Sequence, residues 1–336
     1  MRCTSPRTVG FKTDGKTISW SQKEYSKEFA TFQLPCSKCI ECRLEYARQW
    51  AVRCVHEAAI HKENSFVTLT YTDENLKSPK LHYIDFQLFV KRLRRKRHRE
   101  MIKKIGKLTW SEMDKDQKKQ IEEKYKISIF VTGEYGQKTK RPHWHACIFN
   151  WEPSDPVYKY SNERGDKVYE SQELTDLWGH GIAEFGSVTF QSAGYCARYA
   201  AKKLVHGHDG HEYEPISKKS SHQAIGKRWL EKYHADVFNY GHIVLHDGTT
   251  CSIPRYYEKW YKLKHPEKWS AYVTKTKQEK IDLASNKENS ERAKEKSADE
   301  IRRTENPFST PSAKRLEARK IINEQKFQML QDKLKL

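Results

Sequence analysis

The sequence predicts an α+β fold, and two patterns carry this prediction. Residues 43–62 contain strong helix formers with an apolar recurrence typical of one buried helix face, and residues 65–71 alternate like a half-buried strand. Farther along, residues 126–132 and 143–150 form two predicted strands, and the Gly- and Lys-rich connection between them indicates a hairpin with a long basic loop. A chain of 336 residues has room for one principal domain of about 200 residues with appended segments.

The other predicted elements alternate between helices, short strands and loops. In chain order they are an irregular segment at 1–35, a helix at 85–104, a charged helical insertion at 105–124, a tyrosine-rich excursion at 151–185 with a short helix at 173–178, a strand at 187–190, a helix at 193–204 with Ser192 as N-cap, and strands within 236–245.

The C-terminal part of the chain has a different composition. After residue 273 it is dense in Lys, Glu, Ser and Asn, which predicts a flexible or solvated helical tail over 274–336, with a helix start at Thr310 and Pro311. The predicted organisation is therefore an N-terminal segment (1–60) with a cysteine cluster and the first helix, a main domain (61–260) with charged insertions, and this tail.

The formal charge of +19 predicts a polyanionic partner, either nucleic acid or an anionic membrane surface. No apolar run approaches the roughly 20 residues that span a bilayer, and the first residues lack the apolar core of a signal peptide. We therefore expect a soluble, cytoplasmic protein whose partner is nucleic acid. The aromatic content of 12% fits this, because bases stack on aromatic rings.

A dense run of basic residues lies in the predicted helix at 85–104. Seven cations occupy nine positions: Lys91, Arg92, Arg94, Arg95, Lys96, Arg97 and Arg99. Such a run is often only a solvated face, but these charges repel one another unless an anion lies along them. The sequence thus predicts a surface that contacts DNA phosphates.

Three of the eight cysteines are closely spaced, at Cys36, Cys39 and Cys42. Thiolates at these intervals can converge on one soft cation, with Cys3 as the candidate fourth ligand. Zinc is the default metal for such a group, and an iron–sulfur cluster fits less well. The alternative is a set of reduced thiols on a turn and helix start.

Two histidines one residue apart form a candidate metal site. Alternate side chains of a strand share a face, so His143 and His145 can hold one ion while Trp144 packs in the core behind them. Glu134, at the end of the preceding strand, can supply a third ligand, and such a set accepts Mg²⁺ or Mn²⁺. The alternative is that these are hydrogen-bonded core residues.

Tyr195 and Tyr199 lie four residues apart in a predicted helix and can both face that ion. A tyrosine that attacks phosphorus leaves a covalent 5′-phosphotyrosine and a free 3′-hydroxyl, and a nearby ammonium from Lys202 or Lys203 would favour the phenolate. Either tyrosine could instead be an ordinary core residue of an amphipathic helix. The combination and order of the two motifs favour the catalytic interpretation.

These motifs resemble those of the HUH endonucleases, which initiate rolling-circle replication. The strand Phe66 to Tyr71, the pair at His143 and His145, and the helix with Tyr195, Tyr199 and Lys202 occur in the family's order. Residues 35–43, 48–53, 133–136 and 254–257 are further similar to the replication initiators of gokushoviruses, which are small phages of the Microviridae such as the chlamydia-infecting microviruses. The resemblance covers roughly residues 1 to 260.

The resemblance implies a central antiparallel sheet flanked by helices, with the histidine strand in the middle and the tyrosine helix beside it. It also implies metal-dependent nicking of one origin strand of double-stranded viral DNA in the host bacterial cytoplasm. Strand transfer and ligation would then release circular single-stranded DNA, while host helicase and DNA polymerase extend the 3′ end. An acidic or polar third ligand near Glu134 is typical of the class.

Two alternatives stay open at this stage. A plasmid relaxase or a transposase of the same class would share the site, although a relaxase would be expected to add a helicase or primase region. A non-catalytic basic zinc protein that binds single-stranded DNA would use the histidines only as core residues. A histidine-triad hydrolase is disfavoured, because the strand alternation after His145 leads to Cys147.

Overall fold

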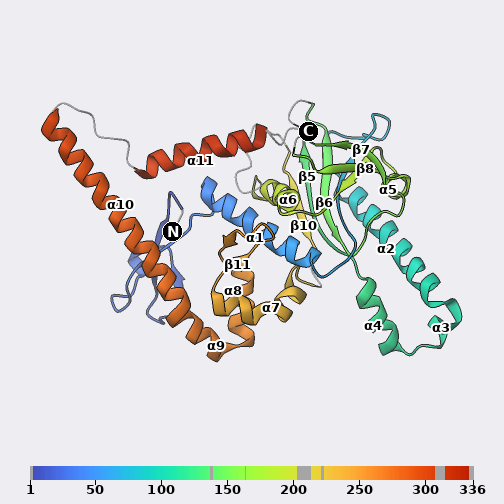
Figure 1. Cartoon of the computed structure of the whole chain (residues 1–336), viewed down its shortest axis with the longest axis horizontal. Coiled ribbons are helices and arrows are strands. Elements are labelled where there is room, and N and C mark those ends of the chain that lie inside the picture. The colour runs from blue at the N-terminus through green and yellow to red at the C-terminus, as the bar shows by residue number, and fades with distance from the viewer. Residues whose placement is uncertain are drawn as a thin grey trace. The chain divides into compact units, whose positions relative to one another are not determined.

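The computed structural model describes residues 3–136, 139–162, 164–202, 213–220, 223–306 and 315–332 (Figure 1). The chain divides into two compact units. We call Tyr46–His234 with Pro254–Tyr257 the sheet unit, and Met1–Glu45, Ala235–Ile253 and Glu258–Leu336 the terminal unit. Each unit is described by itself. The predicted boundaries at residues 60 and 260 stay a prediction, because compactness alone does not show which segments fold independently.

The sheet unit is built on a seven-stranded sheet whose paired neighbours are all antiparallel. Its strands in spatial order are β10 (Ile216–Lys219), β5 (Ser128–Tyr135), β6 (Pro142–Phe149), β4 (Asn64–Thr70), β9 (Ala183–Gly186), β8 (Lys167–Glu170) and β7 (Val157–Ser161). The histidine strand β6 is an interior strand, paired with β5 on one side and β4 on the other. The predicted α+β class with a large antiparallel sheet is confirmed.

Helices cover both faces of this sheet (Figure 1). The helices on the first face are α1 (Ile40–Ala58) and α6 (Phe190–Lys202), and those on the second face are α2 (Tyr83–Ile105) and α5 (Gln172–Trp178). Alternation along β6 creates the division, because Cys147 and Phe149 pack with α1 and α6 while Trp144, Ala146 and Ile148 pack with α2 and α5. Two separate apolar cores therefore hold the sheet in a fixed position between its helices.

The β5–β6 hairpin is held in register by a close contact on the second face. Gly133 pairs with Trp144 across the two strands, and a Cβ at Gly133 would lie 2.6 Å from the indole ring. Trp144 is fully buried, and its Nε1 donates a hydrogen bond of 3.0 Å to the Tyr71 hydroxyl. The prediction that Trp144 packs behind the two histidines is confirmed.

The charged insertion is helical, as predicted. It consists of α3 (Lys107–Glu112) and α4 (Lys115–Tyr125), and α4 begins at a capping box in which Asp114 and Gln117 satisfy each other's backbone N–H groups. Beyond β10, α7 (Lys227–Tyr240) runs from the sheet unit into the terminal unit.

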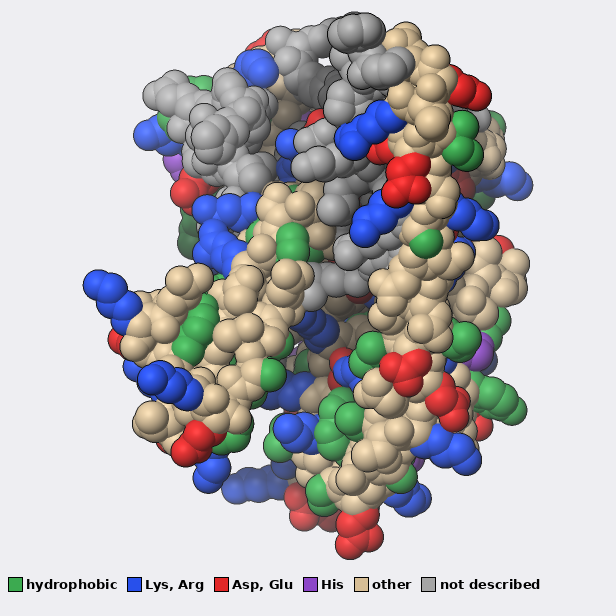
Figure 2. Space-filling model, turned by 90° about the vertical axis from the view of Figure 1, so that its left-hand side faces the viewer, with side chains coloured by type: hydrophobic (Ala, Val, Ile, Leu, Met, Phe, Trp, Pro, Cys, Tyr) green, Lys and Arg blue, Asp and Glu red, His purple; other side chains and the backbone are tan. Residues whose placement is uncertain are grey.

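The terminal unit contains short strands and long exposed helices. Its elements are β1 (Arg7–Phe11), β2 (Ile18–Ser19), η1 (Gln22–Glu24), β3 (Phe32–Leu34), β11 (Ile243–Val244), β12 (Thr250–Cys251), most of α8 (Arg255–Lys264), α9 (Pro266–Ala271), the π-helical η3 (Tyr272–Lys277), α10 (Gln278–Glu305) and α11 (Arg315–Asp332). The C-terminal tail is helical, and nearly all described side chains of α10 are exposed. On the face shown in Figure 2, basic and acidic side chains are interspersed and hydrophobic ones are scattered among them.

Four local predictions were wrong. The segment at 1–35 is not irregular throughout, because β1 pairs with β2 and β3. The strand predicted at 187–190 lies earlier, as β9 at Ala183–Gly186. Residues 236–240 belong to helix α7, and only Ile243–Val244 of the predicted strands forms a strand. The helix predicted at 193–204 begins at Phe190, because the cap is Thr189, whose hydroxyl accepts the Ser192 N–H while the Ser192 hydroxyl accepts the Thr189 N–H. The helix start predicted at Thr310 lies outside the described residues.

Candidate metal and tyrosine site

The register of β5 and β6 places three candidate metal ligands on one face of the sheet. Glu134 pairs directly with His143, and Thr132 pairs with His145. Since side chains alternate along a strand, Glu134, His143 and His145 all point to the first face, where α1 and α6 lie. The candidate ligand atoms of these three residues lie within 4.8 Å of one another.

Both imidazoles approach the same carboxylate oxygen. His143 Nε2 lies 3.0 Å from Glu134 Oε1, and His145 Nε2 lies 2.9 Å from it. The first contact has the geometry of a hydrogen bond. The second is close but poorly directed, so His145 Nε2 and Glu134 Oε2 are buried without a hydrogen-bond partner among the described residues. Buried polar atoms in this condition indicate a missing ligand.

The other ring nitrogens fix the protonation of the two imidazoles. His143 Nδ1 lies 3.2 Å from the carbonyl oxygen of Arg141, which can only accept, so Nδ1 carries the proton. His145 Nδ1 lies 3.0 Å from the Thr68 hydroxyl. A neutral His143 then directs an Nε2 lone pair at the carboxylate, and these two electron pairs repel unless a cation or a second proton lies between them. The residues present therefore fit a divalent cation.

The pKa values agree with this fit. Burial by itself would raise the pKa of Glu134, but its hydrogen bonds to His143 and His145 and their charges outweigh burial and lower the pKa to about 2. Burial is the main cause that lowers the pKa of His145. Glu134 is thus anionic and His145 neutral near pH 7, which are the protonation states that metal ligands require.

Tyr195 reaches the same carboxylate oxygen from helix α6. Its hydroxyl donates a hydrogen bond of 2.8 Å to Glu134 Oε1, and its ring meets the ring of His145 edge to face at a centroid distance of 4.8 Å. The Tyr195 side chain is 8% exposed. One predicted tyrosine therefore lies beside the candidate metal ligands.

The other predicted residues of this motif are described only in part. Tyr199 and Lys202 lie in α6, one and two turns after Tyr195, but their side chains are outside the described part of the structure. Lys203 lies outside the described residues altogether. Their roles stay predictions.

Sequence reasoning missed the groups that orient the imidazoles. Thr68 lies on β4 opposite His145, and the Arg141 carbonyl precedes β6. The strand that contains Thr68 was recognised, but its register against β6 pairs residues 77 positions apart and leaves no local signal.

The seven basic residues of α2 lie on the second face of the sheet, opposite to Tyr195. Three of them are engaged within the protein. Arg92 donates to the carbonyl oxygens of Leu177 and Trp178, Lys96 pairs with Glu100 and Glu173, and Arg97 pairs with Glu63. The other four are exposed: Lys91, Arg94, Arg95 and Arg99.

These four residues line a groove of about 1060 Å³ between α2 and the edge formed by β5 and β10. Lys126 and Lys219 also line the groove, although neither was predicted as a DNA contact. Six cations thus share one concave surface within the sheet unit, which identifies it as the candidate nucleic-acid interface.

Comparison with known proteins places the chain among viral replication proteins. Residues 64–204 match the model of a family described as replication-associated protein ORF2. The chain is 48% identical over 285 residues to the replication-associated protein VP4 of Bdellovibrio phage phiMH2K, covering 84% of each chain. It belongs to the family of phage replication-associated proteins.

Two further relatives of this replication-associated protein are more distant. It is 34% identical to the replication-associated protein ORF4 of Chlamydia phage 1, over 69% of this chain and 54% of the relative, and 27% identical to that of Spiroplasma virus 4, over 84% and 87%. The resemblance to gokushovirus proteins is thereby confirmed. No solved structure matches the chain. Within the described residues, no helix combines the length and apolar character needed to cross a membrane.

The match to the family model extends from the start of β4 to just beyond the end of α6. This replication-associated segment contains Glu134, His143, His145 and both tyrosines. The part of the chain that defines the family is therefore also the part that forms the candidate site.

We expect Mn²⁺ to stabilise the protein through Glu134. A metal that binds only the folded state adds about 2.7 kcal/mol at a hundredfold excess over its Kd, and Glu134→Gln should lose most of this gain. Thermal unfolding with and without Mn²⁺ measures the effect, and Mn²⁺ is suitable because it prefers oxygen and imidazole to thiolate.

The matched control is Glu184→Gln, which removes a carboxylate from β9 that pairs with Lys159. This variant should keep the full response to Mn²⁺. An equally large response in Glu134→Gln would show that the ion binds elsewhere.

Proposed function

We propose that this protein initiates rolling-circle replication of phage DNA by nicking one strand with a tyrosine, as HUH endonucleases do. The observation that carries the proposal is the position of the Tyr195 hydroxyl, 2.8 Å from a carboxylate oxygen that two imidazole nitrogens also approach. Family membership supports a role in viral DNA replication. We place its action in the cytoplasm of the bacterial host, where host helicase and polymerase would extend the new 3′ end.

The candidate ligands supply the electrostatic part of the reaction. Glu134, His143 and His145 would hold Mg²⁺ or Mn²⁺, which stabilises the negative charge that grows on the non-bridging oxygens of the attacked phosphate. Arg141 and Thr68 keep the two imidazoles in orientation through their Nδ1 atoms. Burial of Glu134 and His145 strengthens the interactions of both with a bound cation.

Tyr195 would be the group that attacks. Its phenolic proton is already directed to Glu134 Oε1, so the hydrogen bond favours development of negative charge on the phenolic oxygen. The phenolic oxygen forms a bond to phosphorus while the bond from phosphorus to the 3′ oxygen breaks. The leaving 3′ oxygen gains a proton from solvent, and the 5′ phosphate stays on the tyrosine.

Tyr199 would provide the second nucleophile of the cycle. It lies one turn after Tyr195 in α6, so one tyrosine can hold the cut end while the other attacks the regenerated origin. The retained phosphotyrosine bond then allows ligation of the displaced strand into a circle without ATP. Lys202 is proposed to favour the phenolate form.

The groove along α2 would hold a different stretch of DNA. It lies on the sheet face opposite to Tyr195, so its cations cannot contact the phosphate that this tyrosine attacks. We propose that Lys91, Arg94, Arg95 and Arg99 bind backbone phosphates of a single strand that continues beyond the cleavage point. Lys126 and Lys219 would extend this contact along the sheet edge.

A labelled oligonucleotide tests the nicking reaction. Single strands tiled across the phage genome, each labelled at the 3′ end, should yield one covalent protein–DNA adduct in the presence of Mn²⁺. Replacing both tyrosines, as Tyr195→Phe with Tyr199→Phe, should reduce the adduct about 10³-fold or more, because Phe lacks the nucleophilic oxygen. Single replacements should each lose either initiation or termination.

The control for this experiment is Tyr169→Phe in β8, which should leave adduct formation unchanged. DNA binding by the double variant is measured in parallel, so that a folding defect is recognised. If the double variant forms the adduct at the normal rate, the tyrosine assignment is wrong. If the wild type binds the strand but never forms an adduct with any tested sequence, a non-catalytic single-strand-binding function replaces the proposal.

The groove is tested by removing two of its charges. Arg94→Gln with Arg95→Gln should weaken binding of single-stranded DNA and lower the slope of log K against log salt by about 1.4, because each lost phosphate contact removes about 0.7. Lys115→Gln with Lys119→Gln, on the exposed side of α4, changes the net charge equally and should leave the slope nearly unchanged. Equal effects of the two pairs would refute a specific role for the groove.

A further inference from the structure

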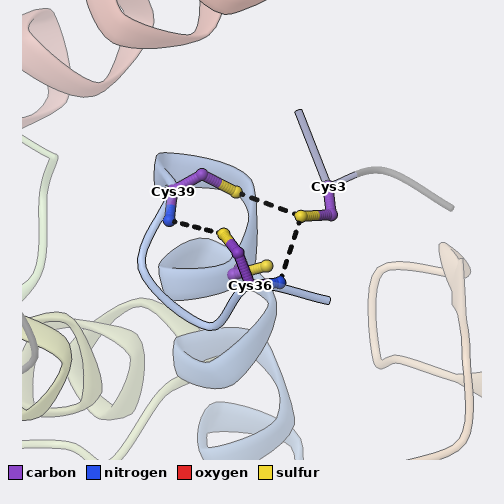
Figure 3. A group of neighbouring side chains, drawn as sticks. Cys3, Cys36 and Cys39 are labelled. Atoms are coloured by element: carbon purple, nitrogen blue, oxygen red, sulfur yellow. Dashed lines mark hydrogen bonds between the residues drawn. The ribbon is translucent and has the colours of Figure 1, made fainter. Parts of the chain in front are cut away.

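A second group of metal-ligand side chains lies in the terminal unit, away from the residues of the proposed nicking reaction. Cys3, Cys36, Cys39 and Cys42 each direct a sulfur atom to one point, and the four sulfur atoms lie within 4.8 Å of one another. Figure 3 shows Cys3, from the N-terminal segment, meeting Cys36 and Cys39 at the turn before α1. The sequence suggested this convergence, and the structure brings the four thiols together.

The backbone explains why these residues meet. β1 and β3 pair antiparallel with Arg7 opposite Leu34, so the residues just before β1 and just after β3 lie at the same end of the strand pair. Cys3 and Cys36 are those residues. The chain then turns through Ser37, which has a φ of 63°, and enters α1, where Cys42 lies in the first turn. Strand pairing and helix start thus place the thiols independently of any bond between them.

Backbone N–H groups point at the sulfur atoms. The N–H groups of Lys38 and Cys39 donate to Cys36 Sγ at 3.4 and 3.2 Å, and the N–H of Cys36 donates to Cys3 Sγ at 3.3 Å. Donors in this arrangement stabilise thiolate charge, as does the positive end of α1. Neutral thiols have no need of such a cluster of donors.

We propose that Cys3, Cys36, Cys39 and Cys42 bind one structural zinc ion. A tetrahedral zinc with Zn–S bonds of about 2.3 Å places its sulfur ligands about 3.8 Å apart. Cys39 Sγ and Cys3 Sγ are 3.7 Å apart. The thiolates of an iron–sulfur cluster bind different iron atoms and stand farther apart, so the observed spacing favours a single ion. A four-thiolate tetrahedral set is typical of zinc sites that are closed to substrate.

The site joins three parts of the terminal unit that share few other contacts. The ion would fix Cys3 and the β1–β3 strand pair to the first turn of α1. Next to it, Glu41 accepts hydrogen bonds from Thr4 at 3.2 Å and from Asn323 of α11 at 3.1 Å. We therefore assign the ion a structural role, and this assignment does not depend on the nicking activity.

Metal analysis of the full-length protein tests the inference. Protein expressed in bacteria and purified without chelator should contain about one zinc per chain that resists dialysis. Cys39→Ser should lower the zinc content at least tenfold, whereas Cys251→Ser, a cysteine outside the cluster, should keep it. Glu134→Ala should also keep it, which separates this site from the one proposed for nicking.

Cobalt substitution of the wild-type protein gives a measurement that does not depend on how the variants fold. Co²⁺ in place of zinc should produce thiolate-to-cobalt charge-transfer absorption and the strong visible bands of a tetrahedral site, and added zinc should remove both. Iron with inorganic sulfide in the purified protein would overturn the proposal. So would a wild-type protein that contains no zinc and shows no cobalt–thiolate absorption.

Discussion

The candidate site depends on the register of one hairpin. Because Glu134 lies directly opposite His143 in the β5–β6 pair, its carboxylate reaches both imidazoles, and Oε1 also accepts the Tyr195 hydroxyl. Three polar groups converge on one buried oxygen. A shift of one residue in this register would move Glu134 to the opposite face of the sheet, and the contact of Gly133 with Trp144 helps to exclude such a shift.

The two faces of the same sheet separate the two tasks proposed for the protein. The first face carries the metal ligands and the tyrosine helix, packed on Trp50, Cys54 and Cys196. The second face carries α2, whose exposed cations line the groove. Arg92 shows that not every cation on α2 is available for DNA, since its guanidinium is held by the carbonyl oxygens of Leu177 and Trp178. Charge in a sequence therefore overestimates the number of DNA contacts.

The sequence predicted the elements with strong local patterns. The helices α1 and α2 and the strands β4, β5 and β6 lie within a few residues of the expected positions, because their apolar residues repeat with a clear period. The residues of the site were also predicted, since the pairs at His143 and His145 and at Tyr195 and Tyr199 fix which side chains share a face.

The failures came from non-local contacts and from ambiguous patterns. The β1–β3 sheet joins Arg7 to Leu34, and no local signal marks that pairing. Residues 236–240 are rich in aromatic and β-branched side chains, yet Leu230, Val237 and Phe238 are buried with a helical period that continues from the preceding residues. Thr68 and the Arg141 carbonyl become visible as partners of the imidazoles only when the sheet is assembled.

The central claim is that one divalent ion is held by Glu134, His143 and His145 beside Tyr195. Anomalous diffraction from crystals of the protein grown with Mn²⁺ tests it most directly. The account predicts one strong manganese peak within coordination distance of a Glu134 oxygen and of Nε2 of both histidines. Manganese bound at another place in nicking-competent protein, with these three residues empty, would contradict it.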